Sequence, residues 1–265
     1  SMENVQEFRV DSNNYPAEFG SGTGGQISII TKSGGNAFHG GLFEYIRNDA
    51  LDARNFFDGA SASILRLNQF GGSVGGPIKK DKLFFFAGFE TLKQRTTSPF
   101  IESTPSAMVR ALPDCPPGTP QQSSPTCMNP AIRPLLKAFP VGQTPSINPL
   151  FDIVNVQEPG SVDEYSGNLR FDYIINSKNK MYVRYNRDDG YGLVTANSTG
   201  SSINYYAVPQ NAVVALTQTF KPTLLNEIKV GLNAPKTRVF ANAPTVPGVD
   251  LSGVTVSLSG VVSLG

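Results

Sequence analysis

The sequence predicts an all-β fold built on one antiparallel sheet of about seven long strands. Helical periodicity is nearly absent, with weak candidates only at residues 106–112 and 132–139, and several segments alternate apolar and polar residues with a period of two. The connections between these segments are alternately short and long. We expect two short strands at residues 4–12 and 25–33, followed by strands at 39–48, 67–78, 82–96, 162–175, 180–189, 210–221 and 223–239.

Alternation divides the expected sheet into two chemically different faces. In residues 162–175, for example, Leu169 and Phe171 fall on one face while Asn168 falls on the other. An ordinary antiparallel sheet with one wet face gives the same pattern, so alternation alone does not separate a soluble sandwich from a membrane barrel. The polar face is expected to carry Arg170, Asp172, Arg184, Asn186, Glu227 and Lys229.

The lengths of the connections favour a barrel. The joints at residues 77–82, 176–180 and 221–223 are short and polar, and the alternate joints are long. Short turns at one rim and long loops at the other are typical of outer-membrane barrels. The predicted long loops are residues 49–66, 97–161 and 190–209.

Composition excludes several other classes of protein. A net charge of +1 over 265 residues gives no electrostatic argument for binding nucleic acid. No run of about 18 apolar residues is present, so no transmembrane helix is encoded. Seventeen Phe and nine Tyr without a Trp suit strands.

Catalytic motifs are weak. Gly71-Gly72-Ser73-Val74-Gly75 matches the G-x-S-x-G elbow of serine hydrolases, but a strand is expected after it where the elbow needs a helix. The only histidine, His39, would have to complete the triad alone. Asp49, Asp52 and Asp58 are irregularly spaced, as in a solvated loop. We therefore predict no enzyme activity, no catalytic residue, no cofactor and no metal site.

Several tracts carry a family resemblance: EFRV at 7–10, YPAEFGSGTGGQISIITKSGGN at 15–36, FHGGLFEYIRN at 38–48 and LNQFGGSVGGPIKKDKLFFFAGFE at 67–90. Together they resemble the junction between plug and barrel in TonB-dependent outer-membrane transporters of the Oar-like branch. The resemblance implies the end of a plug at 1–38, a partial barrel at 39–240 and a loop-like tail at 241–265. Barrels that enclose a plug need about 22 strands, so an incomplete barrel is expected.

The resemblance also implies function. It predicts a fragment of a receptor for energy-coupled solute passage across the bacterial outer membrane, with outer-membrane lipid, the TonB complex and an unknown solute as partners and no nucleic acid. The six polar residues above would face the lumen. The fragment alone is expected not to transport and to self-associate through open edges. The alternative is a soluble secreted all-β binding or adhesive module, with a serine hydrolase using Ser73 less favoured.

The two cysteines, Cys115 and Cys127, lie in a Pro/Ser/Thr-rich stretch without metal-ligand spacing. If the family resemblance holds, the oxidising location implies a disulfide between them. The other interpretation is two unpaired loop thiols.

Overall fold

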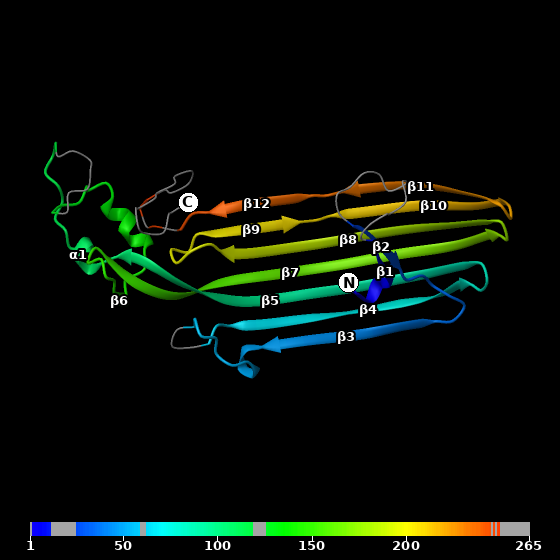
Figure 1. Ribbon diagram of the computed structural model, residues 1–265, viewed down its shortest axis with the longest axis horizontal. Helices are drawn as coiled ribbons and strands as arrows, with labels where there is room; N and C mark the ends of the chain where they lie inside the picture. Colours follow the sequence, from blue (N-terminus) through cyan, green and yellow to red (C-terminus); the bar gives the residue numbers. More distant parts are fainter. Residues whose placement is uncertain are drawn as a thin grey trace.

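The computed structural model describes residues 2–11, 25–58, 62–118, 126–244, 246, 248 and 249. It contains a ten-stranded sheet, whose main path runs β11-β10-β8-β7-β5-β4-β3, and a separate two-stranded hairpin of β1 and β2 (Figure 1). Every pairing between strands is antiparallel. The strands are β1 Val5–Asp11, β2 Gln26–Thr31, β3 His39–Asn48, β4 Leu65–Lys79, β5 Leu83–Pro105, β6 Thr144–Pro145, β7 Phe151–Asn176, β8 Asn179–Thr195, β9 Ser202–Ala207, β10 Gln210–Lys221, β11 Leu224–Ala234 and β12 Thr237–Asn242. The predicted all-β fold with an incomplete antiparallel sheet is confirmed.

Two rows of the sheet are interrupted strands. β8 pairs with β10 over residues 179–187 and with β9 over residues 190–195, so β9 and β10 form one row broken at Val208 and Pro209. β12 pairs with β9 and continues the row of β11 beyond Pro235 and Lys236. The main path therefore has seven rows, in agreement with the expected count of about seven. Prolines explain both breaks, because proline cannot donate to the ladder.

The connections are asymmetric. Turns of two or three residues join β4 to β5, β7 to β8 and β10 to β11, all at the end of the sheet opposite α1 and β6 (Figure 1). The long connections lie at the other end, but two are shorter than predicted. The expected loop 97–161 shrinks to residues 106–150, and most of the expected loop 190–209 is strand, with only residues 196–201 between β8 and β9.

Prolines near the long-loop end account for the first of these errors. Pro99 and Pro105 lie in β5 beyond Thr96, the last residue of β5 that pairs with β4. Pro159 lies in β7 just outside Ser161, where pairing with β8 begins. Each proline thus occupies a stretch with only one strand neighbour, which is where a sheet tolerates proline. The sequence pattern suggested loop, whereas these residues form a two-stranded ribbon of β5 and β7.

The described residues of the connection 106–150 form a small unit at the long-loop end of the sheet (Figure 1). Helix α1 (Ala107–Arg110) and the 3-10 helix η4 (Arg133–Ala138) fall within the two weak helical candidates. Arg110 holds the unit together by donating hydrogen bonds to the carbonyl oxygens of Leu136 (3.0 Å), Phe139 (3.1 Å) and Pro140 (2.8 Å). Burial lowers the pKa of this guanidinium. No helix in the described part of the chain is long and apolar enough to cross a membrane.

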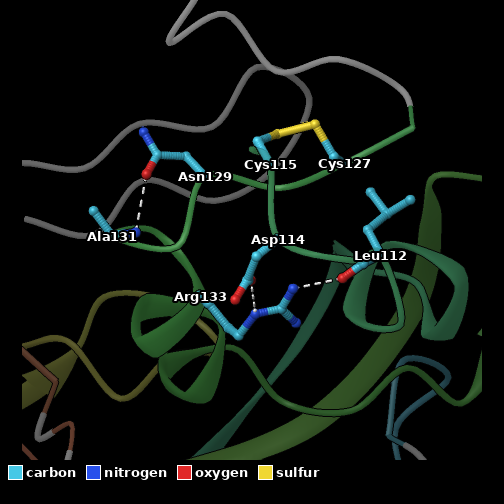
Figure 2. The surroundings of a disulfide bond; sticks show 7 residues. All are labelled: Leu112, Asp114, Cys115, Cys127, Asn129, Ala131 and Arg133. Atoms are coloured by element: carbon cyan, nitrogen blue, oxygen red, sulfur yellow. Dashed lines mark hydrogen bonds and ion pairs between the residues drawn. A yellow bond between two sulfur atoms is a disulfide. The ribbon is translucent and has the colours of Figure 1, made fainter. Parts of the chain in front are cut away.

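The disulfide lies in the same unit. Cys115 and Cys127 are joined with their sulfur atoms 1.98 Å apart, next to the ion pair of Arg133 with Asp114 at 2.7 Å (Figure 2). Two backbone hydrogen bonds of 2.8 Å, from Cys115 N to the Met128 oxygen and from Met128 N to the Pro113 oxygen, bring the two cysteine-bearing segments together. The bridge closes a 12-residue separation at the surface of the long connection.

Candidate functional site

The large sheet has one apolar and one polar face, because residues directly opposite each other on neighbouring strands share a face. Phe89, Gly167 and Arg187 form one such cross-strand row, and Phe85, Phe171 and Val183 form another. The apolar face consists of Leu42, Ile46, Phe70, Val74, Phe85, Phe89, Leu169, Phe171, Tyr173, Met181, Val183, Tyr185, Val214, Leu216, Ile228, Val230 and Leu232. Most of these large side chains are exposed, so nothing in the described chain covers this face.

The aromatic alternation of residues 39–96 predicts that Phe43 and Tyr45 share one face with Phe70, Val74, Phe85 and Phe89. This expectation is wrong: Phe43 lies opposite Gly71, which puts both side chains on the polar face. Their rings pack on each other with centroids 5.5 Å apart. Since both alternating sets of β3 contain large apolar side chains, its pattern alone could not show which set lies on the apolar face.

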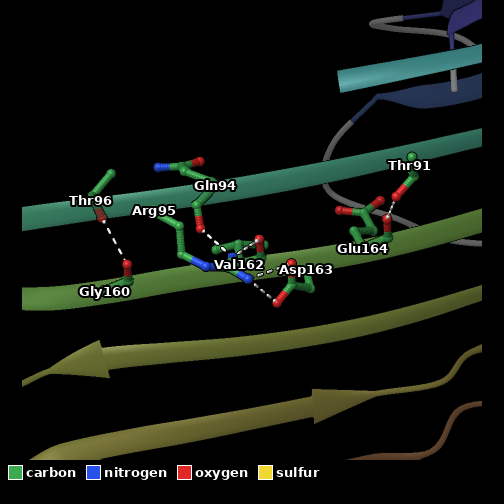
Figure 3. Close-up of polar contacts among 8 residues, drawn as sticks. All are labelled: Thr91, Gln94, Arg95, Thr96, Gly160, Val162, Asp163 and Glu164. Carbon is green, nitrogen blue, oxygen red and sulfur yellow. Dashed lines mark hydrogen bonds and ion pairs between the residues drawn. The ribbon is translucent and has the colours of Figure 1, made fainter. Parts of the chain in front are cut away.

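The border of the apolar face nearest the long connections is formed by charged and aromatic side chains. Arg95 on β5 makes hydrogen bonds of 3.0 and 2.8 Å to the carboxylate of Asp163 on β7 (Figure 3). The ammonium of Lys93 lies 5.8 Å from the ring centroid of Tyr165. From Tyr165 to Ile175 the face spans ten residues, about 33 Å along β7, or about 25 Å along the membrane normal at a typical strand tilt. This height matches the apolar band of outer-membrane barrels.

The hairpin of β1 and β2, which we call the plug hairpin, lies against the polar face. Its main anchor is Arg170 on β7, whose Nη1 donates to the carbonyl oxygen (3.1 Å) and hydroxyl (3.0 Å) of Thr31. Arg170 also forms a two-point ion pair with Asp172, at 2.8 and 2.9 Å, and its guanidinium lies 4.7 Å from the ring centroid of Tyr182. The side chain of Arg170 is only 16% exposed, so these contacts are shielded from bulk water.

The segment after β2 also contacts the sheet closely. A Cβ atom on Gly34 would lie 2.3 Å from the carbonyl oxygen of Phe85, so only glycine fits between the segment and the backbone of β5. Two residues later, Asn36 makes two hydrogen bonds with Asp81: its amide nitrogen donates to the carboxylate (2.6 Å) and its oxygen accepts from the Asp81 backbone (2.8 Å). Asp81 has φ +58°, in the β4–β5 turn. The described segment is thus fixed to the short-turn end of the sheet.

The six polar residues singled out from the sequence all lie on the polar face, and among them Arg170 is hydrogen-bonded to the plug hairpin. Arg170 contacts it directly and Asp172 holds Arg170. Glu227 and Lys229 pair with each other at 2.8 Å on β11. Arg184 donates a 3.5 Å hydrogen bond to Asn211, a residue that the sequence analysis missed. Only the register between strands places Asn211 beside Asn186.

The motifs with possible catalytic or metal-binding roles lie in a strand and in the loop that follows β3. Ser73 lies inside β4, which continues to Lys79, so the strand-to-helix turn of a nucleophile elbow is not present there. Asp49 accepts a hydrogen bond from the Leu65 backbone at 3.3 Å, and Asp52 pairs with an arginine at 3.7 Å.

Asp58 belongs to the same loop. It accepts hydrogen bonds from the Ser63 hydroxyl and from the backbone nitrogen atoms of Asn55 and Ser63. The hydrogen bond from the Ser63 hydroxyl is the main cause that holds the pKa of Asp58 below its usual range. No cluster of three or more potential metal ligands occurs in the described residues.

Comparisons with known proteins agree with this geometry. Residues 30–263 match a family described as "Outer membrane beta barrel domain". The chain is 40% identical over 97 residues to the TonB-dependent transporter Oar of Myxococcus xanthus, a match that covers 34% of this chain and 9% of that protein. No solved structure matches the chain significantly. The resemblance to a TonB-dependent transporter and the expected outer-membrane location are therefore confirmed, and the chain belongs to the outer membrane beta barrel family.

Proposed function

We propose that this chain is the end of the plug and the first part of the wall of a TonB-dependent transporter, which moves a solute across the outer membrane when the TonB complex acts on the plug. The observation that carries the proposal is the contact of Arg170 with Thr31. It joins the plug hairpin to the polar face of a sheet whose other face is apolar and exposed.

The proposal assigns a role to each part of the chain. Residues 1–38 are the end of the plug, residues 39–240 are wall, and residues 241–265 form a loop-like tail, although β12 extends to Asn242 and much of the tail lies outside the described residues. The apolar face contacts outer-membrane lipid. The polar face lines the lumen, so Arg184, Asn186, Glu227 and Lys229 face solute or further plug segments. The exposed apolar face argues against the soluble secreted module.

The isolated chain is not expected to transport. Seven rows run antiparallel, so the two edge strands β3 and β11 point in the same direction and cannot pair with each other in an antiparallel ladder. About eight strands leave an interior only wide enough for side chains, with no room for a plug. Free edges instead favour self-association. Liposomes that contain the 265-residue chain should show no discrete channel conductance; a reproducible single-chain pore would contradict this architecture.

Energy coupling can be tested without knowing the solute. In a full-length transporter that carries this segment, Thr31→Cys places a thiol at the contact with Arg170. We expect a maleimide reagent to label it faster in cells with an energised TonB complex than in cells without TonB. A cysteine in the β7–β8 turn, Lys178→Cys, is the control and should be labelled equally in both. Equal labelling of Thr31→Cys in the two strains would refute coupling through this contact.

A further inference from the structure

Four asparagines form a straight row across the polar face. Asn168 on β7 is opposite Asn186 on β8, Asn186 is opposite Asn211 on β10, and Asn211 is opposite Asn233 on β11. Strands lie about 4.8 Å apart, so this asparagine ladder is about 14 Å wide. It presents four amide groups, each able to donate and accept hydrogen bonds.

The ladder is the floor of a hollow. A cavity of about 300 Å³ lies over it and is lined by all four asparagines, by Asp188 and by Asn4 at the base of the plug hairpin. At about 30 Å³ per molecule, that volume corresponds to about ten waters. The hairpin covers the β7 end of the ladder, where Asn168 is 5% exposed, whereas Asn233 at the β11 end is exposed. The site is therefore a trough that opens away from the plug hairpin.

The polar atoms of the trough have few partners. Seven buried side-chain nitrogen or oxygen atoms in the described residues lack a hydrogen-bond partner, and four of them belong to Asn4, Asn168 and Asp188, which line the trough. A Cβ on Gly88 would meet the side chains of both Asn4 and Asn168, so glycine is what lets these two amides approach. Buried polar groups normally have partners. A cluster of unpaired ones beside a hollow can take its partners from water or from a polar ligand that displaces it.

Side chains of opposite charge lie on β8 on either side of the asparagine ladder. On β8, Arg184 and Asp188 lie two residues to either side of Asn186 and on the same face. They are about 13 Å apart along the strand. The Nε atom of Arg184, which borders the cavity without lining it, and one carboxylate oxygen of Asp188, whose side chain is also hydrogen-bonded to Glu164, are among the unpaired atoms. A cationic group therefore flanks the amides at one end and an anionic group at the other.

We propose that this trough binds a short zwitterionic peptide, a claim that rests on the proposed transport function and names its class of solute. The peptide lies along β8, with its carboxylate at Arg184 and its ammonium at Asp188. It crosses the asparagine ladder at Asn186, whose side-chain amide exchanges hydrogen bonds with the peptide backbone. Three or four extended residues span about 10–13 Å, which fits the separation of the two charges. The plug hairpin closes one side of the site through Asn4.

Binding can be measured on the full 265-residue chain folded in detergent micelles, with calorimetry and trialanine as the probe. We expect trialanine to bind at least fivefold more tightly than N-acetyl-trialanine amide, which lacks both charges. Asn186→Ala should weaken trialanine binding about fivefold to tenfold. Asn68→Ala, which changes an exposed asparagine on the opposite face of β4, is the matched control and should have no effect. If Asn186→Ala loses sheet content by circular dichroism, the near-isosteric Asn186→Asp replaces it.

The orientation of the peptide has its own test. Wild type should prefer trialanine over trialanine amide, and Arg184→Gln should lose that preference while still binding the amide form. Equal binding of free and blocked peptides, displacement by the neutral trisaccharide maltotriose, or no binding by a chain with an intact sheet would each overturn the proposal. Because none of these measurements involves TonB, their failure is distinguishable from failure of the labelling experiment at Thr31→Cys.

Discussion

Replacing Arg170 by methionine should release the plug hairpin from the sheet. The substitution keeps an apolar stem in β7 but removes both hydrogen bonds to Thr31. Hydrogen bonds from a charged group contribute about 1.5–3 kcal/mol each when shielded from water. Taking the lower value for each bond, because Arg170 keeps 16% exposure, the loss is about 3 kcal/mol. That corresponds to an increase of about 150-fold in the detached population of the hairpin.

Hydrogen exchange of the hairpin amides reports detachment directly. An isolated two-stranded hairpin is at best marginally stable in water, so the amides of β1 and β2 should exchange soon after detachment. In Arg170→Met their protection should fall by about the same 150-fold factor, while amides in the centre of β7 stay protected. The measurement needs only the chain in detergent micelles.

A matched control is built into the neighbouring strand. Arg187 also pairs with the aspartate two residues on, its Nε donating to both carboxylate oxygens of Asp189 at 3.0 Å, but it lies on the apolar face with 48% exposure. Arg187→Met should leave the exchange of β1 and β2 unchanged. If both substitutions raise exchange equally, the effect is general destabilisation. If Arg170→Met leaves hairpin exchange within twofold of wild type, Arg170 does not anchor the plug.

Four further outcomes are expected. Gly34→Ala should destabilise the segment after the plug hairpin by about 1–3 kcal/mol, seen as faster exchange there, because the new Cβ would overlap a backbone carbonyl. Thiol titration of the exported, unreduced protein should find no free sulfhydryl at Cys115 or Cys127; two free thiols would refute the pairing. Ser73→Ala should leave any measured esterase turnover unchanged, and a several-hundred-fold loss with folding intact would revive the hydrolase hypothesis. Because hydrogen bonds lower the pKa of Asp58, its loop should keep its protection from pH 7 to about 5 and lose it below about pH 4, and Asp58→Asn should abolish that dependence.

The features that sequence predicted correctly are local ones. Alternation within one strand assigned Leu169 and Arg170 to opposite faces, and short polar joints marked the turns at one end of the sheet. Both signals need only neighbouring residues. The errors arose where the local signal was ambiguous. In β3 both alternating sets contain large apolar side chains, so Phe43 was placed on the wrong face, and prolines in the β5–β7 ribbon suggested loop.

The site was only partly predictable because it depends on register. Asn168, Asn186, Asn211 and Asn233 are separated by stretches that contain turns and other strands, and nothing within any one strand shows that they align. Thr31 is 139 positions away from Arg170 in the sequence. The signal that was available is parity: each asparagine lies in the polar set of its strand. Alternation within a strand predicts the face on which a residue lies, and only the pairing between strands shows which residues align across the sheet.

The pairing register that keeps apolar side chains on one face of the sheet also determines the trough on the other face. A slip of one residue in the pairing of β8 would turn Asn186 toward the apolar face and bring Val183 and Tyr185 under the plug hairpin. Charged side chains of β8 would then lie on the apolar face, and apolar side chains of β8 would pack against the polar face. The apolar face therefore selects the register. Once the register is set, the asparagine ladder and the position of Arg170 follow from it. Substitutions that weaken the apolar pattern of β8, such as Val183→Asn, should therefore disturb the contacts on the polar face even though they touch none of its residues.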